Sequence, residues 1–305
     1  MRKLEKSYGK ETFDKWDKSQ PKDLRPNRTD PVAAAKNIWE VSSFRELLGR
    51  VAFLSSMNKR LILFYRGQTD DRDPLPTLFR SCWKCFGSEQ TFAITHENRT
   101  GYWDKLEEIG QRVCKICDEE RFRVPRRRGL RHTREIQWAI IQHYGLWPTP
   151  LIDVTSSLHI AAGFAMGFRD GSSEKPRPGV LYVVGMPYSV GSITFNGDEH
   201  ITLARLQSVC PPIAKRPHYQ EGFLIGHFPI YTVDEALIKQ AKLIRRLVVK
   251  FKLQGKGDFW GKDFPMFPET ALLPEDDPLL ERFREEFGPE SRAFSLYKQA
   301  QELAA

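Results

Sequence analysis

The chain has 305 residues, of which 40% are hydrophobic and 12% aromatic, enough for a sizeable core in one large domain or two smaller ones. Its formal net charge of +8 permits an acidic partner, although solvated basic faces give the same balance. No apolar run reaches the roughly 18 residues that a membrane span needs, and the basic N-terminal region also carries the acids that transit peptides lack. We therefore expect a cytoplasmic protein without a signal peptide or membrane span.

The N-terminal part of the chain begins with a polar segment and continues into regular structure. Residues 1–36 are charged and interrupted by prolines, which predicts a disordered, basic segment. A capping box at Ser43-Phe44-Arg45-Glu46 opens the first helix. The apolar run Leu61–Tyr65 predicts a short buried strand that ends in Arg66-Gly67-Gln68. Helical spacing predicts two further helices, over residues 101–121 and 133–144.

The centre of the chain crowds polar and turn-forming residues between two helices. A short strand is predicted over Pro150–Val154, and Thr155-Ser156-Ser157 then opens an apolar helix over Leu158–Phe168. A helix this apolar must lie deep in the fold, and its N-terminus presents free N–H groups and the positive end of the helix dipole. That end can hold an anion, or the hydroxyl residues can simply cap the helix.

The C-terminal half is predicted to be strands followed by helices. Segments with β character, bounded by Gly, Pro and Asn, span residues 179–186, 192–195, 200–204, 223–231 and 247–253. Helices are expected at 233–236, after Pro278 and over 291–303. We expect one α+β domain over residues 37–255, with a helical extension, residues 256–305, packed on it.

Two cysteine pairs raise the question of a metal. Cys82 and Cys85 with Cys114 and Cys117 would supply four thiolates, which suit a structural zinc site. The pairs lie farther apart than in a zinc ribbon, and the second pair follows a helical pattern that can be ordinary core. We therefore predict no bound metal.

A basic run is the sharpest charge feature of the sequence. Its six arginines are Arg121, Arg123, Arg126, Arg127, Arg128 and Arg131. Such a run can grip the phosphates of a nucleic acid. Only Phe122 supplies an interleaved aromatic ring, which favours a solvated loop between helices, and nucleic acid stays an alternative partner.

Three other polar features are candidates for chemistry. Arg66 stands at the end of a buried strand and precedes a glycine, which suits a bidentate grip on a diphosphate. An internal salt bridge from Arg66 to Asp153 or Asp70 explains the same pattern equally well. His143, at a helix end, is either a general base or a hydrogen-bonded structural group. The pair Gln220-Glu221 is either a turn or the source of an amide or carboxylate at the mouth of a cleft.

The order of several short motifs resembles the FRG domain family, which is named for its Phe/Tyr-Arg-Gly motif. The motifs are Phe64-Tyr65-Arg66-Gly67-Gln68, Leu75–Arg80, Gln142–Leu146, Pro148-Thr149, Leu151-Ile152-Asp153, Thr155-Ser156, Ala161–Ala165, and the pair Gln220 and Gly222. The resemblance covers roughly residues 40–230. The sequence departs from the family pattern at Trp147, Pro150, Val154 and Phe223.

The layout of these motifs is similar to that of the ADP-ribosyltransferase fold. The resemblance implies an α+β fold, with a helical N-terminal half packed on a mixed, ADP-ribosyltransferase-like split β core. It also implies NAD as substrate, with Arg66 on the pyrophosphate or ribose. Thr155 and Ser156 would brace the nicotinamide ribose, and Gln220 or Glu221 would stand in the place of the catalytic carboxylate. We further expect Gly67, Gln68, His143 and Asp153 to contact the nucleotide.

Three functions follow as hypotheses. The first is an ADP-ribosyltransferase or NAD glycohydrolase, as in a toxin-like effector of bacterial or anti-phage conflict, with an undetermined macromolecular acceptor. The second is a non-catalytic FRG module that binds a nucleotide or a protein. The third is a nucleic-acid-binding protein that uses the arginine run. NAD turnover separates the first hypothesis from the other two.

Overall fold

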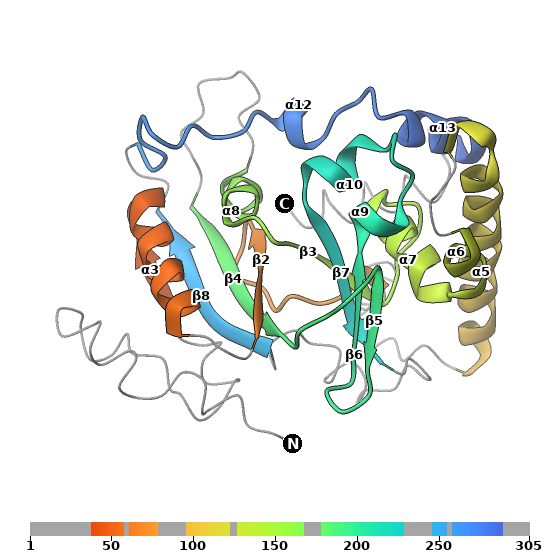
Figure 1. The fold of residues 1–305 in the computed structure, drawn as a ribbon, viewed down its shortest axis with the longest axis horizontal. Coiled ribbons are helices and arrows are strands. Elements are labelled where there is room, and N and C mark those ends of the chain that lie inside the picture. The colour runs from red at the N-terminus through yellow and green to blue at the C-terminus, as the bar shows by residue number, and fades with distance from the viewer. Residues whose placement is uncertain are drawn as a thin grey trace. The chain divides into compact units, whose positions relative to one another are not determined.

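The computed structural model describes residues 38–57, 61–78, 96–122, 127–167, 178–228, 246–254 and 258–288 (Figure 1). The predictions for residues 1–36, 233–236 and 291–303, and for Cys82 and Cys85, lie outside these residues. The chain divides into two compact units. The first takes residues 1–73, 155–188 and 243–269, and the second takes 74–154, 189–242 and 270–305. The domain boundaries expected from the sequence stay a prediction.

The first unit is built on four neighbouring strands. Its elements are β1 (Trp39–Val41), α3 (Phe44–Met57), β2 (Ile62–Gln68), α8 (Leu158–Met166), β4 (Gly179–Met186) and β8 (Leu247–Leu253). The strand order is β1-β8-β4-β2, in which β1 runs parallel to β8 and the other pairs are antiparallel. The N-cap half of the predicted capping box is present, because the Ser43 hydroxyl accepts the N–H of Glu46 at 3.2 Å, while the Glu46 carboxylate accepts the N–H of Ser42 at 2.9 Å.

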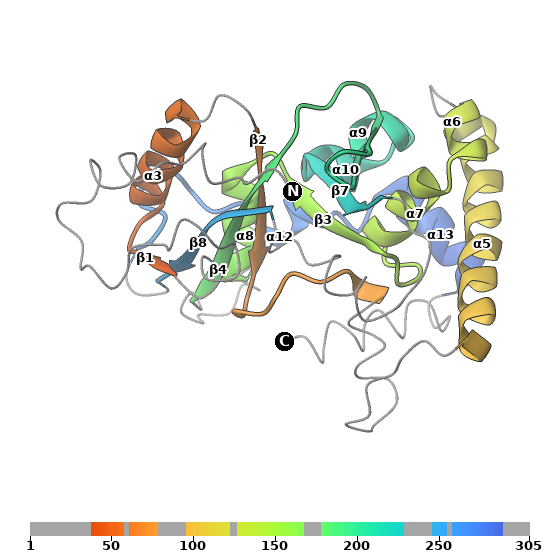
Figure 2. The ribbon, with the colours of Figure 1, turned by 90° about the horizontal axis from the view of Figure 1, so that it is seen from below.

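One face of this sheet is covered by α8, which lies beside β2 and β4 (Figures 1 and 2). Tyr65 and Leu181 on this face share a core cluster with the alanines of α8. A Cβ at Gly67 would lie 1.9 Å from the carbonyl oxygen of Ala161, so only glycine allows the helix this close. Because side chains alternate along a strand, Arg66 points to the opposite face.

The second unit combines helices with four further strands. Its elements are α5 (His96–Asp118), η3 (Glu120–Phe122), α6 (Arg127–His132), α7 (Arg134–His143), β3 (Leu151–Thr155), β5 (Ile193–Asn196), β6 (Ile201–Arg205), α9 (Leu206–Val209), α10 (Lys215–Tyr219), β7 (Gly222–His227), α12 (Glu269–Leu272) and α13 (Pro278–Phe287). The strand order is β3-β7-β6-β5. The end residues Thr155 of β3 and Glu269 of α12 belong to the first unit.

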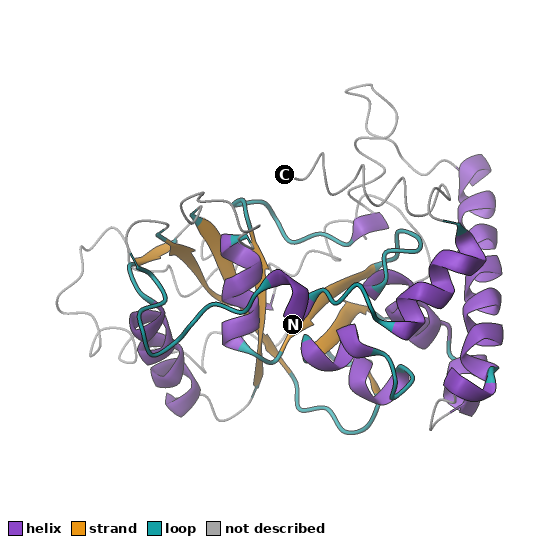
Figure 3. Cartoon of the chain, turned by 90° about the horizontal axis from the view of Figure 1, so that it is seen from above, coloured by secondary structure: helices purple, strands orange, loops and turns teal. Residues whose placement is uncertain are grey.

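A single apolar cluster joins the helices of the second unit to its sheet. Its members come from α5, α7 and α13, which gather at one side of the unit, and from β6 and β7 (Figure 3). Leu106 of α5, Ile140 of α7 and Phe283 of α13 are all fully buried. Arg112 of α5 also binds Glu286 of α13, with 3.0 Å between Nε and the carboxylate oxygen. Ile136, Ile140 and Ile141 of α7 are buried in the same cluster.

The side chain of Asp277 ties three helices of the second unit together. It is fully buried, and one carboxylate oxygen accepts the hydroxyl of Tyr144 and the backbone N–H groups of Lys215 and Arg216. The other oxygen accepts the first N–H groups of α13, from Leu279 and Leu280. Pro278 begins α13, as predicted, with Asp277 as its N-cap. Asp277 therefore caps α13 from inside the core.

Two sequence predictions need correction. The strand predicted over Leu61–Tyr65 continues through Gln68, because β4 supplies a register partner for every residue up to Gln68↔Val180. Arg66 therefore lies among the last three residues of β2, at the strand end where the sequence placed it. The expected loop over the arginine run is wrong for residues 127–132, which form α6 and are anchored by the buried Leu130. Arg123 and Arg126 lie outside the described residues.

The coarse fold expectation is supported: helices combine with a mixed sheet. The N-terminal half also contributes strands β1, β2 and β3. Among the described residues, no helix combines the length and apolarity needed to cross a bilayer.

Candidate functional site

The predicted site residues fall into two sets, one in each unit. Arg66, Gly67, Gln68, Thr155 and Ser156 belong to the first unit. His143, Asp153, Gln220 and Glu221 belong to the second. The contacts within each set can be described separately.

Arg66 is the centre of the first set. Its side chain is half-buried, and its Nε donates to the Oε1 of Gln68 at 2.9 Å. Gln68 in turn donates through Nε2 to the carbonyl of Arg72 at 2.9 Å. Within the Arg66-Gly67-Gln68 motif, Gln68 therefore orients the guanidinium on one face of the sheet and binds the loop that follows β2. The glycine allows α8 to pack closely on the other face.

A row of polar side chains crosses the sheet beside Arg66. Arg66 is the register partner of Tyr182 on β4, and Tyr182 is the partner of Lys250 on β8, so the three side chains share a face. The ammonium group of the buried Lys250 lies 2.7 and 2.8 Å from the two carboxylate oxygens of Asp71. Tyr182 donates its hydroxyl to Asp71 at 3.1 Å and to the carbonyl of Arg72 at 2.8 Å.

Tyr182 is held as a hydrogen-bond donor by its surroundings. Burial, followed by the negative charge of Asp71, raises the pKa of this phenol far above its usual value. The nearby Arg66 opposes this effect only partly. The site therefore combines the guanidinium of Arg66, the phenolic O–H of Tyr182 and the amino group of Lys250 with the Asp71 carboxylate, and the negative charge of Asp73 also acts on Tyr182.

The hydroxyl residues of the central passage serve the start of α8. The Thr155 hydroxyl accepts the N–H of Ser157 at 3.0 Å, and the Ser157 hydroxyl accepts the N–H of Ile160 at 3.4 Å. Thr155 pairs with Tyr65, which places its side chain on the α8 face and not on the Arg66 face. Ser156 is exposed. Thr155 and Ser157 therefore accept backbone N–H groups at the start of α8, as in the alternative in which these hydroxyl residues cap the helix. Binding of a ribose by Thr155 or Ser156 stays a prediction.

In the second set, motif residues from three segments meet in one hydrogen-bond network. The buried Gln142 donates through Nε2 to the hydroxyl of Thr77 at 2.9 Å and to Asp153 at 3.2 Å. It accepts at Oε1 from the hydroxyl of Thr149 at 2.8 Å. All four residues belong to the motifs that resemble the FRG family. These motifs therefore stabilise the fold through a hydrogen-bond network, in addition to any role in a binding site.

His143 joins the same network. Its side chain is 3% exposed, and Nδ1 lies 3.2 Å from an oxygen of Asp153. A carboxylate partner holds the proton of a neutral imidazole on Nδ1. The buried Nε2 then has no hydrogen-bond partner within the described part of the chain. The contact with Asp153 fits the alternative in which His143 is a hydrogen-bonded structural group. Contact of His143 or Asp153 with a nucleotide stays a prediction.

Gln220 and Glu221 join helix α10 to strand β7. Gln220 is the C-cap of α10, and its Nε2 donates to the carbonyl of Leu272 at 2.7 Å. Glu221 is exposed and adopts a left-handed backbone conformation with φ of 45°, which is uncommon for a residue with a side chain. Strained backbone of this kind often occurs at functional sites. The pair therefore forms a turn, and a catalytic role for either residue stays a prediction.

The cysteines that the structure describes are part of the core. Cys117 and Cys210 are buried, and the Cys114 thiol donates weakly to the carbonyl of Leu130 at 3.5 Å. Burial raises the pKa of the Cys114 thiol to about 11. In the part of the chain that is described, no group of three or more His, Cys, Asp or Glu side chains is arranged to hold a metal ion.

Acidic side chains pair with two arginines of the basic run. Arg121 pairs with Glu119 at 3.4 Å, and its guanidinium lies over the ring of Phe122. The Nε of Arg131 lies 3.0 Å from Asp118. Arg128 is exposed. These ion pairs reduce the charge that the run offers to phosphates.

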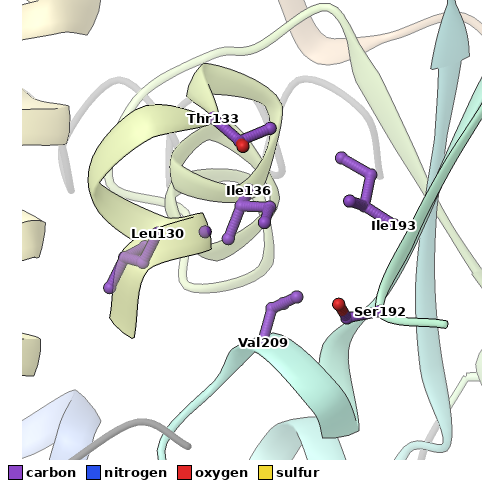
Figure 4. A pocket seen from close by; sticks show the side chains of 7 residues that line it. Leu130, Thr133, Ile136, Ser192, Ile193 and Val209 are labelled. Carbon is purple, nitrogen blue, oxygen red and sulfur yellow. The ribbon is translucent and has the colours of Figure 1, made fainter. Parts of the chain in front are cut away.

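A cavity of about 200 Å³ lies between α6, α7, the start of β5 and the end of α9 (Figure 4). Its lining consists of Gly129, Leu130, Thr133, Ile136, Ser192, Ile193 and Val209. It contains no charged side chain and none of the predicted site residues. It is also smaller than the roughly 300–1,000 Å³ of ordinary ligand pockets, so it does not suit a nucleotide.

Sequence reasoning missed Asp71, Tyr182 and Lys250. Tyr182 and Lys250 sit in strands whose apolar character was recognised, and alternation along those strands places both on one face. Their neighbourhood to Arg66 depends on strand order and register, for which the sequence carries no local signal. Asp71 was recognised only as part of a loop.

No curated protein and no solved structure matches the chain. The match to a family model begins at the first residue of β2 and ends beyond α8. It includes the Arg66 motif and the Gln142 network but not Gln220 or Gly222. Residues 62–174 of this chain match the FRG domain family, which supports the resemblance drawn from its motifs.

Proposed function

We propose that the protein binds NAD or a related nucleotide diphosphate and acts on it as an ADP-ribosyltransferase or NAD glycohydrolase. The observation that carries the proposal is the position of Arg66. Its guanidinium lies in a strand, is oriented by Gln68, and shares its face with Tyr182 and Lys250. A planar guanidinium with neighbouring donors suits the two phosphates of a dinucleotide.

The reaction needs more than phosphate binding. Cleavage of the nicotinamide–ribose bond passes through a state with oxocarbenium character, which a carboxylate stabilises. We assign this role to Glu221, because the neighbouring Gln220 carries no charge and uses its amide on the carbonyl of Leu272. The exposed Ser156 is the proposed ribose contact. A toxin-like effector is the proposed biological setting.

The experiment is incubation of the purified protein with NAD, with and without cell lysate as acceptor, while free nicotinamide is measured. Glu221→Gln should lower nicotinamide release by about 100-fold, a typical effect of losing one charge-stabilising group in a transition state. Gln220→Ala should affect folding more than turnover, since it removes the bond to Leu272. Equal activity of Glu221→Gln and the wild-type protein would remove Glu221 from the mechanism.

A second candidate is a nucleotide-binding FRG module without catalysis. The observation that favours it is the structural use of the predicted catalytic elements. Gln220 binds a backbone carbonyl, Thr155 caps a turn, and His143 pairs with Asp153. NAD binding with no release of nicotinamide, in the presence and absence of lysate, would establish this candidate in place of the first.

A further inference from the structure

The face of the first unit that bears Arg66 also carries a buried lysine whose acidic partner comes from a surface loop. Lys250 is 5% exposed, although it lies on a strand among apolar residues. A buried ammonium group is unfavourable unless a negative partner compensates it. That partner is Asp71, whose side chain is 49% exposed and belongs to the loop after β2.

The loop folds back over the polar row of the sheet. Gln68 holds the carbonyl of Arg72, and Tyr182 binds both that carbonyl and the Asp71 carboxylate. An exposed loop thus delivers one carboxylate to a buried ammonium and a buried phenol. This set of donors is what an anionic oxygen of a ligand would also require.

We propose that Arg66, Tyr182 and Lys250 form a binding site for the phosphates of a diphosphate ligand, and that the Asp71 carboxylate competes with the ligand for this site. The site shares Arg66 with the proposed function and goes beyond it, because it requires no cleavage of NAD. It rests on the diphosphate binding of the proposed function and makes the segment Asp70–Asp73 a strap that the ligand displaces.

The spacing of the row fits a diphosphate. Neighbouring strands lie about 4.8 Å apart, so Arg66 and Lys250 are separated by roughly 10 Å at their backbones, with Tyr182 between them. Long side chains from both ends can converge on two linked phosphates, while the central hydroxyl donates to a bridging or terminal oxygen. In the structure, Asp71 binds the Tyr182 and Lys250 part of the row.

The test is calorimetric titration of the full chain with inorganic pyrophosphate, and separately with ADP-ribose, at constant ionic strength. Asp71→Asn keeps the size of the competing side chain but removes its charge, so both ligands should bind at least about tenfold more tightly. Asp70→Asn is the matched control. It removes a charge from the same loop, but Asp70 pairs with Arg72, so affinity should change less than about twofold.

A second pair of variants tests the lysine. In the Asp71→Asn background, Lys250→Met should weaken pyrophosphate binding at least about tenfold. Because this double variant lacks the charges of both Asp71 and Lys250, it leaves neither charge buried without its partner. Lys252→Met in the same background is its control, because Lys252 lies two residues along β8 and pairs with Glu40 on the surface. Its effect on affinity should stay within about twofold.

Three results would overturn the inference. They are an unchanged affinity in Asp71→Asn, equal tightening in Asp70→Asn and Asp71→Asn, or equal weakening by the two lysine variants. Pyrophosphate binding that responds as expected, without any NAD turnover, would support this site while removing the proposed reaction. NAD turnover, combined with an unchanged affinity of Asp71→Asn for pyrophosphate and ADP-ribose, would support the proposed reaction and remove the competition by Asp71.

Discussion

Arg66 and Gly67 are adjacent in the chain but act on opposite faces of β2. The sequence suggested that the glycine leaves room for a diphosphate beside the arginine. The structure instead places α8 over the glycine, 1.9 Å from where a Cβ would sit, while the guanidinium faces Tyr182. Because successive side chains of a strand point to opposite faces, the arginine offers a binding group on one face while the glycine is needed for helix packing on the other.

This view of Gly67 gives a stability prediction. Gly67→Ala must push α8 away from β2, because the new methyl group meets backbone atoms of Ala161 and Ala165. We expect a loss of about 3 kcal/mol or more in the free energy of unfolding, measured by urea denaturation. Gly49→Ala, in the exposed middle of α3 with nothing nearby, should instead raise stability by about 0.5–1 kcal/mol. Similar small effects for both variants would contradict the close packing.

At the scale of elements, the helices and strands with strong periodicity could be predicted, and their polar connections could not. The strands over 179–186 and 247–253 occur with the predicted bounds, because apolar runs between breakers signal them locally. The extension of β2 through Gln68 depends on pairing with β4, a partner more than 100 residues away. The central role of Asp277 similarly depends on three helices meeting.

The buried carboxylate of Asp277 gives a prediction about the free energy of unfolding. Asp277→Ala removes the acceptor for five donors, the buried ones of Tyr144, Leu279 and Leu280 and the partly buried ones of Lys215 and Arg216. We expect a loss of about 3 kcal/mol or more in unfolding free energy. Asp276→Ala is the adjacent control, because Asp276 is exposed and pairs only at the surface with Lys215, so its denaturation midpoint should hardly change. If both variants unfold at the same urea concentration, the proposed role of Asp277 fails.

At the scale of the whole molecule, the sequence supplied the mixed fold and the family motifs but not the arrangement of the candidate site. Short motifs report local chemistry, so Arg66 and the Gln142-His143 pair could be selected. Tyr182 and Lys250 could not, since only the strand order β8-β4-β2 brings them beside Arg66. Thr155 shows the converse: a hydroxyl that suggested ribose binding caps the chain before α8.

The buried weak acids of both units predict how stability depends on pH. Burial raises the pKa of Tyr144 and Cys210 well above their usual values of 10 and 9, and Tyr182 shifts in the same direction. The folded state keeps these protons above pH 9 while the unfolded state releases them, so their contribution is complete below the unfolded pKa and is lost as pH rises. The unfolding free energy should therefore fall between about pH 9 and 11, less steeply in Cys210→Ala. A flat or rising profile would contradict these shifts.

The central claim is that Arg66 binds the diphosphate of NAD, and calorimetry of NAD binding tests it most directly. The wild-type protein should bind NAD, and Arg66→Lys, which keeps the charge but loses the planar fork, should weaken binding at least about tenfold. Arg45→Lys, an exposed arginine of the same unit paired with Asp263, is the control and should bind like the wild type. NAD that neither binds to the wild-type protein nor is consumed by it would contradict the account.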